Sequence, residues 1–127
     1  MNIDDLTIGE AKELAKLFGG SAPAQPINSG LVGKYVIVRC RDAGVHAGFL
    51  ESHLGRECVL LEARRLWYWK PANNQKFLSG VAIAGLSGES KVGAPVSRIL
   101  LTENCEIIEI EKSAVESIRE AKVDERA

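Results

Sequence analysis

Apolar residues near the start of the chain are spaced as on an amphipathic helix. From Ile8 to Phe18 they recur at steps of three and four residues, and Thr7 with Glu10 forms a capping box at the start of this pattern. Two glycines follow directly and supply a stop signal. We therefore predict a helical arm over residues 1–18.

Residues 19–33 are rich in Pro, Gly and small side chains, which is the composition of a linker. A helix as short as the predicted arm is marginal in isolation, so its apolar face must dock either on its own domain or on another chain. The long linker favours another chain, because helices that pack within a domain usually have short connections. The residues that we expect to make this contact are Ile8, Ala11, Leu14 and Phe18.

From residue 34 the pattern changes to short β-branched and apolar runs typical of strands. Strands are expected over residues 34–40, 45–51 and 57–63, with a hairpin loop over residues 52–56. Residues 64–70 either continue the third strand or form a fourth, bent at Ala63. Gly44 and Gly48 indicate a tight turn or closely packed backbone.

The second half of the core mixes helix and strand signals. Apolar spacing from Phe77 to Leu86 predicts a short helix, residues 87–94 a loop, and residues 96–101 and 105–111 two further strands. Ser113 with Glu116 predicts a second capping box and a short terminal helix. The expected fold is α+β and β-rich, a small antiparallel sheet or partly open barrel, with a core over residues 34–112 and a helix and charged tail over residues 113–127.

Composition agrees with a single globular domain. The chain has 127 residues, of which 46% are hydrophobic and 26% are charged. No apolar run approaches the roughly 18 residues that span a bilayer. Asp4 and Asp5 stand where a secretory signal carries basic residues, and the three cysteines have no paired spacing. We expect a cytoplasmic product with reduced thiols and no membrane partner.

The net charge of −1 hides an uneven distribution. Residues 33–76 hold eight basic and four acidic side chains, whereas residues 101–127 hold eight acidic and four basic ones. The basic centre could bind an anionic ligand or pair with the acidic ends of a neighbouring copy. The alternative is a solvated surface of mixed charge.

The chain shows no pattern typical of a catalytic or metal site. His46 and His53 are its two histidines, and neither has the spacing to a cysteine or to another histidine that metal sites use. Pairing Cys40 or Cys58 with His46 as nucleophile and base would rest on no motif. The glycines of residues 80–88 fit neither a phosphate-binding loop nor a dinucleotide fingerprint. We predict a non-enzymatic protein with no metal and no cofactor.

The most unusual stretch is Ala63-Arg64-Arg65-Leu66-Trp67-Tyr68-Trp69. If extended, it places Arg65, Trp67 and Trp69 on one face. That face suits a subunit contact, in which Trp, Tyr and Arg are enriched, or stacking on a base. The alternative is that one or both tryptophans fill the core. The candidate surface contacts are Arg64, Arg65, Trp67, Tyr68 and Trp69.

A resemblance to a known family rests on two motifs, Gly44-Val45-His46-Ala47-Gly48 and Ala63–Trp69. With residues 32–39, 99–103 and 106–110, they make the chain resemble an uncharacterised family of short proteins of tailed bacteriophages and prophages. The opening residues 6–11 look like a helix that precedes other small phage domains. The resemblance implies a phage context, on a virion or in the host cytoplasm during infection, and transfers no site residues.

Two function classes follow from these observations. The first is a virion or assembly accessory protein, such as a capsid decoration or minor structural subunit. It would be anchored by the arm to other phage structural proteins and would work as a homo-oligomer. The second is an intracellular phage protein that sequesters a nucleotide signal or nucleic acid of the host defence, motivated by the basic centre and the Trp67/Trp69 face.

Overall fold

The computed structural model describes residues 29–124. The predicted arm with Ile8, Ala11, Leu14 and Phe18, and most of the predicted linker, lie outside the described residues. The described part is β-rich with two short helices, which confirms the expected fold class. The strands are β1 (Tyr35–Cys40), β2 (Gly44–Leu54), β3 (Glu57–Tyr68), β4 (Lys91–Val92), β5 (Val96–Leu101) and β6 (Asn104–Glu109), and the helices are α2 (Leu78–Ala84) and α3 (Lys112–Arg119).

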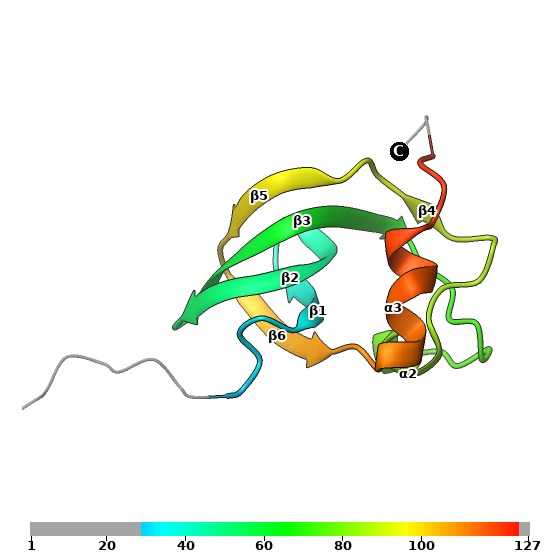
Figure 1. Cartoon of the computed structure of the whole chain (residues 1–127), viewed down its shortest axis with the longest axis horizontal. Helices are drawn as coiled ribbons and strands as arrows, with labels where there is room; N and C mark the ends of the chain where they lie inside the picture. Colours follow the sequence, from blue (N-terminus) through cyan, green and yellow to red (C-terminus); the bar gives the residue numbers. More distant parts are fainter. Residues whose placement is uncertain (1–28, 125–127) are drawn as a thin grey trace, which may run out of the picture.

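All six strands belong to one antiparallel sheet. β1, β2 and β3 form a meander, and β6 returns to pair with β1. β5 and β4 share the other edge of β3, where β5 pairs with Cys58–Ala63 and β4 with Leu66–Tyr68. The sheet curls so that the consecutive strands β5 and β6 carry its two edges toward one another without closing it (Figure 1).

The hydrophobic core has two parts, one on each face of β1. Val36, Val38 and Cys40 pack with apolar residues of β2, β3 and β5 in a cluster built from strands. Tyr35 and Ile37 point the other way and pack with α2 and α3, whose Val81 and Ile118 are fully buried. The continuous apolar run of β1 is thus explained by burial on both faces.

The β2–β3 hairpin is longer than its sequence predicts. Pairing continues to Leu54 and Glu57, so the expected loop over residues 52–56 shortens to a two-residue turn in which Gly55 has a φ of 58°. β3 then runs on through Ala63 as one strand. The bend that was expected at Ala63 is a bulge in the pairing with β2, and it lies one residue earlier, at Glu62, whose φ is 51°.

Two further expectations for local structure are corrected. The predicted loop over residues 87–94 contains β4, whose two residues pair with the end of β3. The capping box at Ser113 is wrong, because α3 begins at Lys112 after Glu111 and no side chain caps it. The predicted helix after Phe77 is confirmed as α2. Neither helix of the described part is long and apolar enough to cross a membrane.

Candidate functional site

The aromatic segment forms the far end of β3, beyond the irregularity at Glu62. Its side chains alternate as a strand requires, and Arg65, Trp67 and Trp69 line one hollow of about 340 Å³. The opposite wall is the turn between β1 and β2, which includes Asp42 and Ala43. The structure therefore brings together the three residues expected to share a face.

Arg65 holds the turn that faces it. Its Nη2 donates a hydrogen bond to the carbonyl oxygen of Ala43 at 2.8 Å, and His46 Nε2 donates to the same oxygen at 2.9 Å. Burial lowers the pKa of His46, which keeps its ring neutral. The hollow thus has one wall that is fixed by two side chains, while Arg65 itself stays exposed.

The three aromatic side chains of the segment have different surroundings. Trp69 is half-buried and packs against the core under the helices. Trp67 and Tyr68 are each 46% exposed, and the ammonium of Lys91 lies 4.8 Å from the centre of the Trp67 ring. Trp69 therefore anchors the strand end, while Trp67 and Tyr68 are available to a partner.

Lys91 was not among the candidates from the sequence. It falls in the segment expected to be a loop, and it reaches Trp67 because β4 pairs with the end of β3, where Lys91 lies opposite Tyr68. A two-residue strand leaves no periodic signal, so the sequence offered no means of finding this contact.

Arg64 is not a surface contact, and its candidacy is corrected. Its side chain points to the core side of β3 and is 4% exposed. The guanidinium reaches carbonyl oxygens at the end of α3, those of Ile118 at 2.9 Å and Ala121 at 2.6 Å among them. Strand alternation put Arg64 and Arg65 on opposite faces, and the face that carries Arg64 is the one that the helices cover.

A family model matches residues 33–118, which is more than half of the chain. The chain belongs to the family described as Domain of unknown function (DUF6948). No curated protein and no solved structure matches it.

The DUF6948 match contains the whole candidate site, from the β1–β2 turn through the aromatic end of β3 to Lys91. It also contains all six strands and nearly all of α3. The family match therefore covers both the sheet and α3, the helix whose end accepts hydrogen bonds from Arg64. The predicted arm lies outside the match.

Two of the cysteines of the DUF6948 domain, Cys40 and Cys58, lie in the same core cluster. Cys40 Sγ accepts a hydrogen bond from the Asn104 side chain at 3.4 Å, and His53 Nε2 contacts Ser29 Oγ at 2.9 Å. Burial raises the pKa of both buried thiols, that of Cys58 to about 11. Across residues 29–124 no three His, Cys, Asp or Glu residues are placed to share a metal ion.

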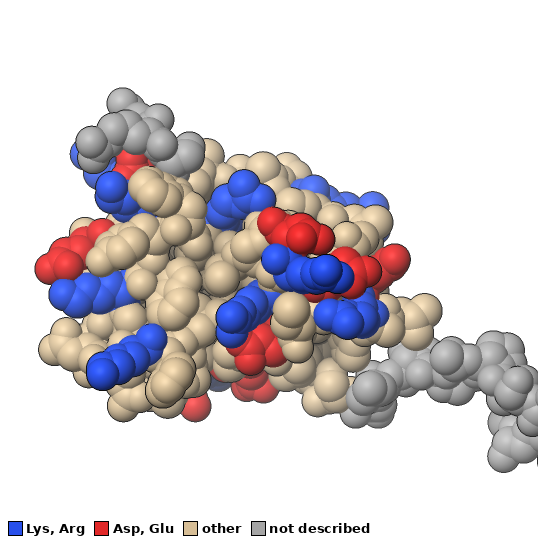
Figure 2. Space-filling model, turned by 180° about the vertical axis from the view of Figure 1, so that it is seen from behind, with Lys and Arg blue, Asp and Glu red and all other residues tan. Residues whose placement is uncertain are grey.

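Three residues of the basic centre, Arg39, Arg56 and Lys70, form ion pairs with acidic residues of the same chain. Arg39 lies 3.7 Å from Glu106 and Arg56 lies 3.9 Å from Glu103, so both of these pairs join the basic centre to the acidic C-terminal part. Blue and red side chains accordingly alternate over the face in Figure 2. All four partners are exposed, where such pairs add little stability. These pairs are consistent with a surface of mixed charge, and the binding of an anion or of a neighbouring copy stays a prediction.

Proposed function

We propose that this DUF6948 protein is a non-enzymatic accessory protein of a tailed bacteriophage, acting as a capsid decoration or minor structural subunit. In this proposal the N-terminal arm anchors the chain to a phage structural protein. The exposed end of β3 contacts a neighbouring subunit, which is a second copy of the chain or another structural protein.

The observation that carries this proposal is the exposure of Trp67 and Tyr68 at the end of a fixed strand. Large aromatic side chains bury much apolar area in an interface and lose little conformational entropy there. For this reason they contribute a large share of the binding free energy of many interfaces. Trp69 holds the strand end on the core, and Arg65 holds the adjoining turn. A partner would therefore meet a surface that is already ordered.

The first test is mass spectrometry of purified particles of the phage that encodes the chain. The proposal expects the protein in the particle at a copy number of tens or more, since a decoration or minor structural subunit repeats with the symmetry of the particle. Absence of the protein from the particle would contradict it.

The second test compares full-length variants in the same particles. Trp67→Ala with Tyr68→Ala, and separately Leu14→Asp, should lower incorporation. The matched control is Phe77→Ala, because Phe77 is an aromatic residue that is 74% exposed elsewhere on the domain. Equal incorporation of all the variants would contradict both proposed contacts.

A second candidate is an intracellular protein that binds a nucleotide or nucleic acid. The hollow beside Arg65 and Trp67 supports it, because it combines a stacking ring with cationic groups. Arg65→Ala with Trp67→Ala should then abolish binding of cyclic nucleotides, measured by calorimetry, without unfolding the protein. Wild-type protein that binds no member of a cyclic-nucleotide panel would contradict this candidate.

A further inference from the structure

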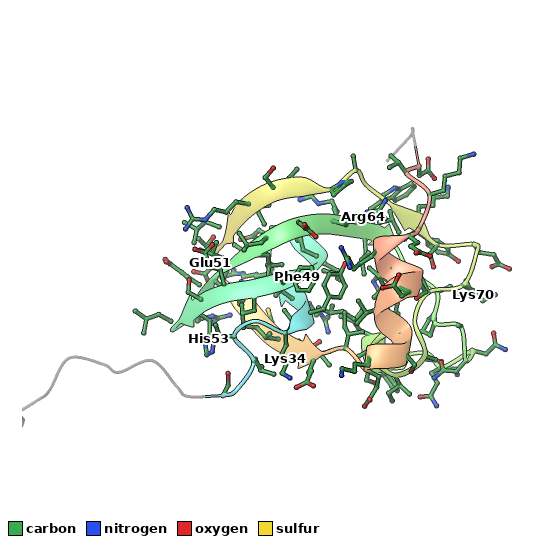
Figure 3. All side chains as sticks on the ribbon, in the orientation of Figure 1. Lys34, Phe49, Glu51, His53, Arg64 and Lys70 are labelled. Carbon is green, nitrogen blue, oxygen red and sulfur yellow. The ribbon has the colours of Figure 1, made fainter. Side chains whose placement is uncertain are left out.

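A second hollow lies on the face of β3 that carries Arg64, opposite the face of Arg65 and Trp67. It has a volume of about 360 Å³ and lies between β1, β3, the start of β5 and the end of α3. Its lining residues are Tyr35, Glu62, Arg64, Pro95, Val96, Ser97 and Arg119. Figure 3 shows the Arg64 side chain between β3 and α3.

Arg64 has donor groups that its structural contacts do not use. Nε donates to Gly93, and Nη1 donates to three carbonyl oxygens at the end of α3. These bonds explain how Arg64 holds the helix. Nη2 is buried and has no hydrogen-bond partner. A guanidinium carries five N–H donors, and two of them, those of Nη2, remain to be satisfied.

The hydroxyl of Tyr35 is a second buried donor without a partner. Tyr35 is 5% exposed, and its ring is fixed edge-on against Phe49, with 5.0 Å between the ring centres. Burial raises the pKa of this hydroxyl to about 12, so it keeps its proton at neutral pH. Two buried donors of different types therefore line the same hollow.

The positive charge of Arg64 is met by carbonyl oxygens at the end of α3 and not by a carboxylate. Arg119 and Glu62 form an exposed pair at 3.4 Å, and the Arg119 guanidinium also lies 5.3 Å from the centre of the Phe49 ring. No carboxylate within residues 29–124 pairs with Arg64. A buried cation without a counterion favours binding of a single negative charge.

We propose that this hollow binds the carboxylate of a small organic acid, with Arg64 Nη2 and the Tyr35 hydroxyl as donors. A carboxylate supplies one negative charge and two acceptor oxygens, which matches the two donors. Pro95 and Val96 offer an apolar wall for the rest of the ligand. This site is distinct from the contact surface at Trp67 and does not depend on the proposed function.

Glu62 and Arg119 line the same hollow as the two donors. Both side chains are exposed, and pairs of this kind are weak, so in our proposal the pair opens when a ligand carboxylate enters. Glu62 then competes with the ligand carboxylate for Arg119. Neutralising Glu62 should strengthen ligand binding, whereas removing the Tyr35 hydroxyl should weaken it.

The experiment titrates full-length protein with sodium benzoate at constant ionic strength and follows the amide resonances of Gly93, Ser97 and Arg119 by NMR. Wild-type protein should show saturable shifts. Tyr35→Phe should bind about tenfold more weakly, which is the usual effect of losing one hydrogen bond to a charged group. Glu62→Gln should bind more tightly.

The matched control for Glu62→Gln is Glu103→Gln. Glu103 also has a positive φ, 55°, and also pairs with an exposed arginine, but it lies outside the hollow. Its replacement should leave benzoate binding unchanged. Tyr35→Phe should stay folded, because the hydroxyl that it loses has no partner in the protein.

Three results of the benzoate titrations would overturn the proposal. They are the absence of saturable shifts in the wild type, equal binding by wild type and Tyr35→Phe, and equal effects of Glu62→Gln and Glu103→Gln. Acetate and inorganic phosphate extend the same titration. Weaker binding of acetate than of benzoate would support an organic acid with an apolar body, and tighter binding of phosphate would overturn the choice of a carboxylate.

Discussion

Arg64 joins the sheet to the last helix through a single side chain. Its guanidinium satisfies carbonyl oxygens at the end of α3, which a helix otherwise leaves without partners, and places a positive charge at the negative end of the helix dipole. Nε adds a bond to Gly93, next to β4. One residue of β3 therefore fixes both α3 and the segment that leads from β4 to β5.

Replacing Arg64 should cost far more stability than replacing its neighbour. Arg64→Met removes the Arg64 donors from the carbonyl oxygens of Arg119 and Ala121 and leaves that of Ile118 with a backbone donor alone, and we expect it to lower the free energy of unfolding by about 3 kcal/mol. Arg65→Met removes an exposed bond to Ala43 and should cost less than about 1 kcal/mol. Urea unfolding of both variants measures the difference. Equal losses would contradict the structural role of Arg64.

The sequence could show that Arg64 and Arg65 face opposite ways, but not which of them is buried. Arginine is rarely buried, so composition favoured exposure for both. Arg64 is buried because the end of α3 supplies acceptors, and these lie 54 to 57 residues further along the chain. The role of a residue whose partners are so distant does not follow from local spacing.

At the scale of elements, β3 organises the fold because it serves two partners along one edge. β5 pairs with the first half of that edge and β4 with the second. The positive φ of Glu62 lies close to the point where the pairing partner changes from β5 to β4. The aromatic end of β3 thus projects past the part of the sheet that β5 covers. This position leaves Trp67 and Tyr68 exposed while Trp69 returns to the core.

The two tryptophans should therefore differ in their effect on stability. Trp69→Ala removes contacts with the core and should lower the free energy of unfolding by about 2 kcal/mol, less than for a fully buried ring. Trp67→Ala removes an exposed ring and one contact with Lys91, and should cost about 0.5 kcal/mol. Thermal unfolding followed by far-UV circular dichroism measures both. A larger loss for Trp67→Ala would mean that Trp67, not Trp69, anchors the strand.

Most elements were predictable because their signals are local. Alternation and β-branched residues located the three strands of the meander, and helical spacing located α2 despite its glycines. β4 has two residues and no such signal. For the candidate site, alternation grouped Arg65, Trp67 and Trp69 correctly, but the wall formed by the β1–β2 turn depends on strand pairing.

At the scale of the whole molecule, the two cores contain ionisable groups that the fold keeps neutral. Cys58 lies in the cluster between the strands and Tyr35 in the cluster under the helices. Burial is the main cause that raises the pKa of each, from 9.0 to about 11 for Cys58 and from 10.0 to about 12 for Tyr35. Their titration therefore reports on both halves of the core at once.

These shifts predict that alkaline solution destabilises the protein in two steps. Above pH 9 the Cys58 thiol ionises in the unfolded chain but not in the folded one, and above pH 10 the same holds for Tyr35. The unfolded state then binds fewer protons, so stability falls as pH rises, by up to about 1.4 kcal/mol per pH unit for each group. Urea unfolding across this range, under reducing conditions, measures the slope.

Two variants show which side chain causes each part of the fall in stability with pH. Cys58→Ala should reduce the first step and leave the part that the buried Cys40 thiol contributes, since burial raises its pKa as well. Tyr35→Phe should flatten the second step without altering the first, because Tyr35 lies in the other cluster. Cys105 is the control for thiol ionisation, since it is exposed and its replacement by Ala should leave both steps in place. A wild-type stability that stays constant from pH 9 upward would mean that both cores admit the charged forms. The burial of Cys58 and Tyr35, which penalises their charged forms, argues against that outcome.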